Sequence, residues 1–179
     1  MDLDGLWSSD RARQNTAYEQ VMAATAEPVP WAGDVWDDVV AHLAGTDNHD
    51  RAIAAQLLGN LAAHDTGGRI ERDLPALMAV TRDERFVTAR HALKSVWRAG
   101  LSGDKARATV VGALAARYRE AEGEKNGTLV RHDIVESLRH LRDATQDDAI
   151  EAVARELIAL EPDPKYRKKY ARHWPVSRG

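Results

Sequence analysis

Apolar residues recur along most of this chain at the spacing of one helix face. No segment alternates apolar and polar residues as a half-buried strand does, so the pattern predicts an all-α protein. Glycine and proline interrupt the pattern at regular intervals, as expected of short connections between helices. The predicted helices lie near residues 9–25, 33–44, 48–63, 72–80, 84–99, 103–121, 127–142 and 146–160.

Residues beside these interruptions indicate where the helices begin. A side-chain oxygen there can accept hydrogen bonds from the first free N–H groups of the helix. We expect such caps at Ser9, Asn48, Ser102 and Thr145. Asp73 followed by Pro75 predicts a further helix start, because proline is favoured in the first turn.

Four of the predicted helices share one register, with apolar or small residues at i+3, i+6, i+7 and i+10. The register begins at Arg11, Arg51, Phe86 and Arg131, so the offsets are 40, 35 and 45 residues. A shorter amphipathic helix lies between each two of them. One helix pair cannot bury its own apolar stripe, so a recurring pair predicts stacking into one elongated core. Small residues suit close helix approach at Ala54, Ala89, Ala92 and Ser137.

The second and fourth of these helices resemble the HEAT-repeat family. The resemblance rests on Asp50-Arg51, Ala54, Leu57-Leu58 and Leu61, and on Val130-Arg131, Ile134, Ser137-Leu138 and Leu141. The third unit departs from it, with Phe86 in place of the arginine, and the first has Gln14 at a small-residue position. The resemblance implies a right-handed α-solenoid of about four helix pairs, whose second helices line a concave face. It implies no fixed chemistry.

Charge divides the chain of 179 residues into two parts. After Pro162 stand six basic residues against one acid, a net charge of +5, which leaves −8 for residues 1–162. We expect a repeat domain over 1–162 and, over 163–179, a basic tail or a short helix that caps the last repeat. The basic residues of this tail are Lys165, Arg167, Lys168, Lys169, Arg172 and Arg178.

Cysteine is absent, which excludes disulfides and thiolate chemistry. No apolar run is long enough to span a bilayer, and the acidic N-terminus lacks the pattern of a signal peptide. We therefore expect a cytoplasmic protein without membrane contact. Arg outnumbers Lys by 19 to 6, which fits a GC-rich bacterial genome.

The predicted binding surface lies opposite the core stripe of the third and fourth repeated helices. Arg90, Lys94 and Arg98 follow one another at four-residue intervals beside Trp97, and such a strip can contact phosphate or an acidic protein surface. The same residues also fit an ordinary solvated helix face. The strip does not continue on the second helix, which has Ala55, Gly59 and Ala63 there. We expect the full binding surface to comprise Arg90, His91, Lys94, Trp97, Arg98, Glu136 and Arg139.

Candidate metal ligands occur on the fourth helix, where His132, Glu136 and His140 are spaced by four residues, with His91 level with Glu136 on the third. A span of eight residues separates the two histidines by about 12 Å along a helix, so one ion would need both side chains to lean inward. Glu136 and His140 also fit a simple exposed pair. We therefore expect no metal or cofactor.

His-Asp dipeptides at residues 49–50, 64–65 and 132–133 allow a comparison with the HD phosphohydrolases, which bind metal through such a pair. Asp50 and Asp65 stand near a helix start and in a turn, where aspartate is favoured for backbone hydrogen bonds. The structural role is therefore the stronger interpretation.

We expect a non-enzymatic scaffold that binds a partner protein through its concave groove, with no catalytic residues. The alternative is a nucleic-acid-binding module similar to the HEAT-like DNA glycosylases, for which Arg90, Lys94, Trp97 and Arg98 would line the groove. The acidic body argues against strong binding to a DNA duplex.

Overall fold

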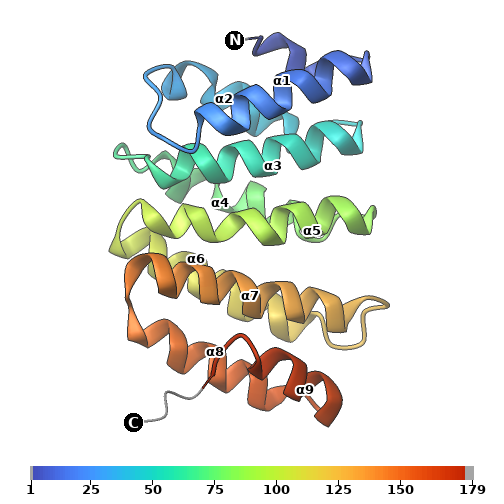
Figure 1. Cartoon of the computed structure of the whole chain (residues 1–179), viewed down its shortest axis with the longest axis vertical. Helices are drawn as coiled ribbons and strands as arrows, with labels where there is room; N and C mark the ends of the chain where they lie inside the picture. The colour runs from blue at the N-terminus through green and yellow to red at the C-terminus, as the bar shows by residue number, and fades with distance from the viewer. Residues whose placement is uncertain (1, 176–179) are drawn as a thin grey trace.

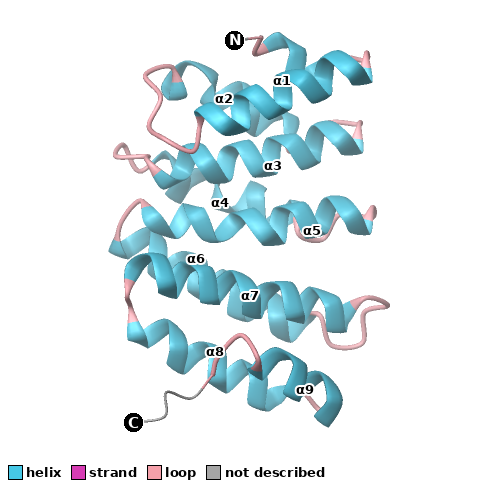
Figure 2. Ribbon diagram, viewed as in Figure 1, coloured by secondary structure: helices cyan, strands magenta, loops and turns pink. Residues whose placement is uncertain are grey.

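The computed structural model describes residues 2–175 and confirms the all-helical prediction, because this part of the chain contains no strand (Figure 2). Nine α-helices follow one another within it: α1 (Arg11–Ala24), α2 (Ala32–His42), α3 (Asn48–Ala63), α4 (Arg69–Val80), α5 (Phe86–Ser95), α6 (Asp104–Glu120), α7 (Gly127–Thr145), α8 (Asp148–Leu160) and α9 (Pro164–Ala171). The 3-10 helix η1 (Asp4–Trp7) precedes α1, and η2 (Val96–Leu101) continues from α5. Over residues 2–175, every helix is too short or too polar to cross a membrane.

The helices form two layers. Figure 1 shows α1, α3, α5 and α7 side by side along the molecule, with α2, α4, α6 and α8 behind them. We call these the front layer and the back layer. Contacts join α1 to α3, α3 to α5 and α5 to α7, and likewise α2 to α4, α4 to α6 and α6 to α8. Successive helix pairs therefore touch in sequence order, and the N and C labels stand at opposite ends of the long axis.

Aspartate side chains cap four of the helices, at positions other than the predicted caps. Four aspartates accept hydrogen bonds from the first backbone N–H groups of a helix, namely Asp10, Asp47, Asp147 and Asp163. The caps predicted at Ser9, Asn48 and Thr145 are wrong because a carboxylate one or two positions away takes that role. The cap predicted at Ser102 is also wrong, since Gly103 precedes α6 and no side chain caps that helix.

The start predicted at Asp73 is wrong as well, because α4 begins at Arg69 and Pro75 lies inside it. Proline removes one intrahelical hydrogen bond and leaves the carbonyl four residues earlier, that of Glu71, without its donor. Both Pro75 and Glu71 are exposed, so water can replace the missing donor. Leu74 and Leu77 remain buried on the opposite face of the helix.

Close approach to α3 marks the end of α5, which stops before the predicted limit of residue 99. A Cβ atom at Gly59 of α3 would lie only 2.8 Å from the carbonyl oxygen of Ser95. The Ser95 hydroxyl donates toward the carbonyl oxygen of Ala55, 3.2 Å away on α3. Beyond Ser95 the chain tightens into η2, which carries Trp97 and Arg98.

Small buried residues recur wherever front-layer helices meet. Ala54, Ala92 and Ser137 are each no more than 1% exposed, as the close-approach prediction requires. The Ser137 hydroxyl donates to the carbonyl oxygen of Leu93 at 2.6 Å, so α7 also approaches the backbone of α5. Close backbone contacts thus join α3 to α5 and α5 to α7.

Arginine–carboxylate pairs join each front-layer helix from α1 to α7 to a segment that follows it in the chain. The closest N–O distances are 2.6 Å for Arg11–Asp47, 2.5 Å for Arg51–Asp83, 2.6 Å for Arg90–Asp133 and 3.0 Å for Arg131–Glu161. We call these pairs the arginine series. Phe86 interrupts the sequence register in α5, but Arg90, one turn later, supplies the missing guanidinium. The third repeat therefore departs from the pattern in sequence without losing the contact.

The basic segment after residue 162 folds back onto the body. α9 packs against α7 and α8, and both Tyr170 and Trp174 are buried. The Tyr170 hydroxyl donates to the carbonyl oxygen of Thr128 at 2.7 Å, and the Trp174 indole N–H donates toward that of Val135 at 3.3 Å. Of the basic tail residues, Arg178 lies outside the described part of the chain.

Two glycine-to-alanine substitutions test the α3–α5 contact. Gly59→Ala is expected to lower the free energy of unfolding by about 1–3 kcal/mol, because the new methyl group meets the Ser95 carbonyl. Gly112→Ala is the matched control, since nothing lies within 4 Å of its added Cβ in α6. It should raise that free energy by about 0.5–1 kcal/mol through helix propensity alone. Urea unfolding measures both, and equal effects would refute the close contact.

Candidate functional site

The predicted basic strip lies on α5 and η2, but the structure neutralises two of its three cations. Both oxygens of Asp133 accept hydrogen bonds from Arg90, from Nε at 2.6 Å and from Nη2 at 2.9 Å. The Lys94 ammonium lies 3.6 Å from a carboxylate oxygen of Glu136. α7 thus supplies an acid opposite each of these two basic residues. The sequence of α5 alone could not predict these ion pairs.

Asp133 is buried, and its charge depends on this pairing. Burial by itself would raise the pKa of Asp133, but the hydrogen bonds from Arg90, the nearby ring of His132 and the surrounding positive charges hold that pKa below its ordinary value. Arg90 is therefore a structural residue of the arginine series. Its positive charge is already paired with Asp133.

Arg98 differs from its two neighbours on the strip. Its guanidinium stacks over the ring of Trp97, with Cζ 4.8 Å from the ring centroid. Within residues 2–175, no carboxylate lies within ion-pair distance of Arg98. Burial lowers the pKa of Arg98, since desolvation disfavours an uncompensated cation. Trp97 in turn donates its indole N–H to the carbonyl oxygen of Lys94 at 3.1 Å. This bond fixes the orientation of the ring on which Arg98 stacks.

Two cavities lie side by side on the front layer, between α1 and α5 and over α3. The first, of about 410 Å³, is lined by Arg11, Gln14, Asn15, Tyr18, His49, Ala52, Ile53, Gln56 and His91. The second, of about 400 Å³, is lined by Met22, Thr25, Ala26, Asn60, Ala63, His64, Trp97, Arg98 and Leu101. Gln56 and Asn60 stand one turn apart on α3, so the cavities follow each other along that helix. We call the two together the α3 groove.

Sequence analysis identified only the α5 wall of this groove. His91, Trp97 and Arg98 belong to it, as predicted for a binding surface on that helix. The α1 wall, with Tyr18, was assigned to the core stripe, but Tyr18 is only partly buried and its hydroxyl donates to Gln56 at 2.9 Å. Of the small α3 residues first taken as a break in the basic strip, Ala63 lines the groove, whereas Ala55 and Gly59 contact α5.

Among the other predicted binding residues, Glu136 and Arg139 lie on α7, outside the lining of the groove. Arg139 donates to the carbonyl oxygen of His173 at 3.1 Å, and its Cζ lies 5.5 Å from the ring centroid of Trp174. Arg139 therefore helps to hold the chain after α9.

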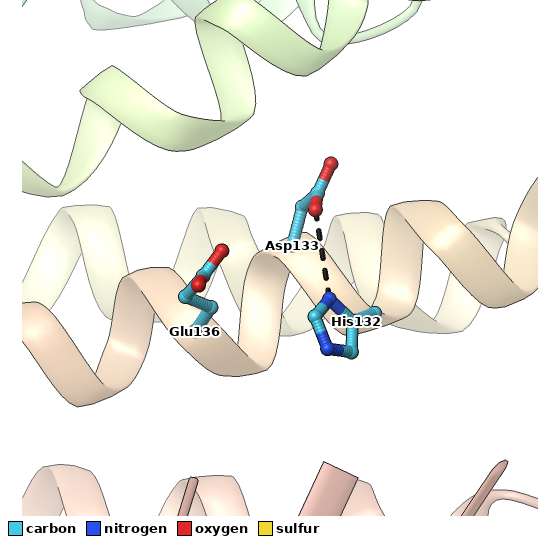
Figure 3. Close-up of side chains that lie close together, drawn as sticks. All are labelled: His132, Asp133 and Glu136. Carbon is cyan, nitrogen blue, oxygen red and sulfur yellow. Dashed lines mark ion pairs between the residues drawn. The ribbon is translucent and has the colours of Figure 1, made fainter. Parts of the chain in front are cut away.

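The candidate metal ligands separate into two groups. Potential ligand atoms of His132, Asp133 and Glu136 lie within 4.8 Å of one another on α7 (Figure 3). His140 does not join this group, because its ring packs against Trp97 with centroids 5.5 Å apart. His173, which sequence analysis did not consider, contacts His132 alone among these residues, with the two Nε2 atoms 3.0 Å apart.

Each aspartate of the three His-Asp pairs has a structural partner. Asp50 accepts a hydrogen bond from Gln14, and Asp65 accepts the backbone N–H groups of Gly67 and Ile70 in the turn before α4. Asp133 pairs with Arg90. These contacts agree with the structural interpretation of the dipeptides.

Comparison of the chain with protein-family models, with curated proteins and with solved structures finds no match in any of the three.

Removing Arg90 tests its structural role through pH. Arg90→Met should lower the free energy of unfolding at pH 7 by about 2–3 kcal/mol, less than for a fully buried pair because solvent reaches a third of Arg90. In the wild type the depressed pKa of Asp133 stabilises the fold above about pH 4, and this stability is lost on further acidification. In the variant burial is no longer opposed by Arg90, so the pKa of Asp133 rises and the carboxylate becomes protonated at higher pH. The deficit should therefore shrink between pH 7 and pH 4.

Urea unfolding of the wild type and of Arg90→Met across this pH range measures the deficit in the free energy of unfolding. Arg119→Met serves as control, because Arg119 pairs with Glu156 at the exposed surface of the back layer. Its effect should stay below about 1 kcal/mol and should not vary with pH. A deficit of Arg90→Met that is constant from pH 7 to pH 4 would mean that Asp133 does not depend on Arg90.

Proposed function

We propose that this chain is a non-enzymatic binding protein, a HEAT-like α-solenoid whose α3 groove holds an acidic segment of a partner protein. The recurring helix pairs and their contacts in sequence order support the solenoid. The observation that carries the ligand class is the charge of the groove. The described residues that line its two cavities include two arginines and three histidines but no carboxylate. This is unusual in a chain with 28 acidic residues and a net charge of −3.

Arg98 is the proposed anchor for a carboxylate of that segment. An unpaired, partly buried guanidinium has already lost much of its hydration. A ligand carboxylate would therefore replace the favourable interactions with water that burial removed. The Trp97 ring holds the guanidinium plane from one side. Bidentate hydrogen bonds to aspartate or glutamate would then fix the position of the bound segment.

Carboxamides along the groove suit the backbone of an extended peptide. Gln14, Asn15, Gln56 and Asn60 come from both α1 and α3, and each side chain both donates and accepts hydrogen bonds. Gln14 is committed to Leu6 and Asp50, Gln56 to Tyr18 and Ala52, and Asn60 to Thr25, whereas Asn15 is exposed and can reach a ligand. Tyr18 and Met22 add partly buried apolar surface between these amides, which favours a ligand with apolar residues among its acids.

Nucleic acid, the alternative expected from sequence, has less support. Phosphate binding needs several free cations, but Arg90 and Lys94 are matched by Asp133 and Glu136. Arg98 alone offers too little charge for a duplex.

Peptide binding tests this proposal. Two labelled twelve-residue peptide pools, one alternating Asp or Glu with Leu or Phe and the other with Lys or Arg at the charged positions, are titrated by fluorescence anisotropy. We expect binding of the acidic pool alone. Arg98→Glu should weaken it about 10- to 100-fold, because it replaces an attraction with a repulsion inside the groove.

Lys168→Glu is the matched control, since it changes the net charge equally on the exposed surface of α9. It should leave the affinity within about twofold, the size of a screened long-range effect. Equal binding of both pools, equal losses in both variants, or an Arg98-dependent affinity for a short DNA duplex would contradict the proposal.

A further inference from the structure

Four cations lie on one exposed side of α9 and of the residue that follows it. Lys165, Lys168, Lys169 and Arg172 stand at i, i+3, i+4 and i+7, so they share one side of the helix over about 10 Å. All four side chains are exposed. We call these residues the α9 stripe. Tyr170, on another side of the helix, is buried against the body and holds the stripe toward solvent.

The charge of the α9 stripe is not matched by nearby acids. Over residues 2–175, no carboxylate lies within ion-pair distance of its four cations. The nearest acids in sequence already have partners. Glu156 and Glu161 pair with arginines, and Asp163 caps α9 by accepting the backbone N–H of Lys165. Like charges one turn apart repel each other, so an anionic ligand would relieve a repulsion that the helix carries by itself.

The most acidic part of the chain lies at the other end of the molecule. Residues 2–45 contain eight acids and two arginines, a net charge of −6. Contacts run from α1 through α3, α5 and α7 to α9, which makes four helix spacings of about 8–10 Å each (Figure 1). Physiological salt screens charges over about 8 Å, so these acids hardly weaken the positive potential at the stripe.

The surroundings of the stripe indicate which polyanion it suits. An anionic membrane binds amphipathic helices through large apolar side chains as well as cations. In α9, however, Tyr170 is buried and Tyr166 is partly buried against the body. Single-stranded nucleic acid gains much of its affinity from bases stacked on aromatic rings, and Trp174 is buried as well. A duplex presents closely spaced phosphates and requires only surface cations, which the stripe provides.

We propose that the α9 stripe binds the phosphate backbone of a nucleic-acid duplex, independently of the α3 groove. Binding to phosphates requires several free cations; the groove offers Arg98 alone, whereas the stripe offers four. Lysine and arginine contacts to phosphate position a protein on a duplex without reading its bases. The stripe therefore binds duplexes of different sequence alike.

Fluorescence anisotropy of the full-length chain with a labelled DNA duplex of about twenty base pairs tests the stripe. The logarithm of the binding constant should fall with the logarithm of salt concentration at a slope near −3.6, about 0.9 for each of four phosphate contacts. Two duplexes of unrelated sequence should bind equally. Lys169→Glu should weaken binding at least about 10-fold at low salt and reduce the slope by about 1, because a phosphate contact is lost and a repulsion is added.

Lys105→Glu is the matched control. It changes the net charge equally, but Lys105 lies on α6 and already pairs with Glu71. Its duplex affinity should stay within about twofold of the wild type, and circular dichroism verifies the fold of both variants. Absence of duplex binding at low salt, or equal losses in the two variants, would overturn the proposal. So would a Lys169-dependent affinity that is higher for the single strand or for phosphatidylserine vesicles than for the duplex.

Discussion

The close approach of front-layer helices is the constraint on which the rest of the structure depends. Gly59 has no side chain, and the backbone of α5 fills the space that a Cβ would take, 2.8 Å from the Ser95 carbonyl oxygen. Ser137 repeats the arrangement between α7 and α5 through its bond to the Leu93 carbonyl. Helices that meet through such small residues must lie side by side. Each front-layer helix therefore packs on its sequence neighbour in that layer, and the back layer follows the same order.

Charge placement follows from this packing. Once the helices lie side by side, an arginine near the start of each one reaches a carboxylate of the next repeat, as Arg51 reaches Asp83 and Arg131 reaches Glu161. The carboxylates of these pairs thus lie just before α3, α5 and α9 and between α5 and α7. The α3 groove, bounded by α1 and α5, keeps basic and neutral groups only. Selectivity for an acidic segment would then arise because the carboxylates pair with arginines outside the groove.

Sequence periodicity was sufficient to predict that the chain is all-helical and roughly where its helices lie, because burial of an apolar face repeats every 3.6 residues and leaves a recognisable pattern. Cap positions were less predictable, since Ser9 and Asp10 stand side by side and both can accept the first N–H groups. The site was predicted only in part. Arg98 and Trp97 were identified, but the partners of Arg90 and Lys94 lie about 40 residues away on α7. His173 joins His132 only after α9 folds back, and no local pattern encodes that contact.

Nuclear Overhauser effects in the unmodified, isotope-labelled chain test the central packing claim most directly. A Cβ at Gly59 would lie 3.3 Å from the Ser95 Cβ, so the α-protons of Gly59 must be close to the β-protons of Ser95. The account predicts a strong cross-peak between these protons, together with contacts between Thr25 and Asn60 across α1 and α3. Absence of the Gly59–Ser95 cross-peak in a folded, fully assigned chain would contradict the packing of α3 on α5, and the α3 groove would lose its basis.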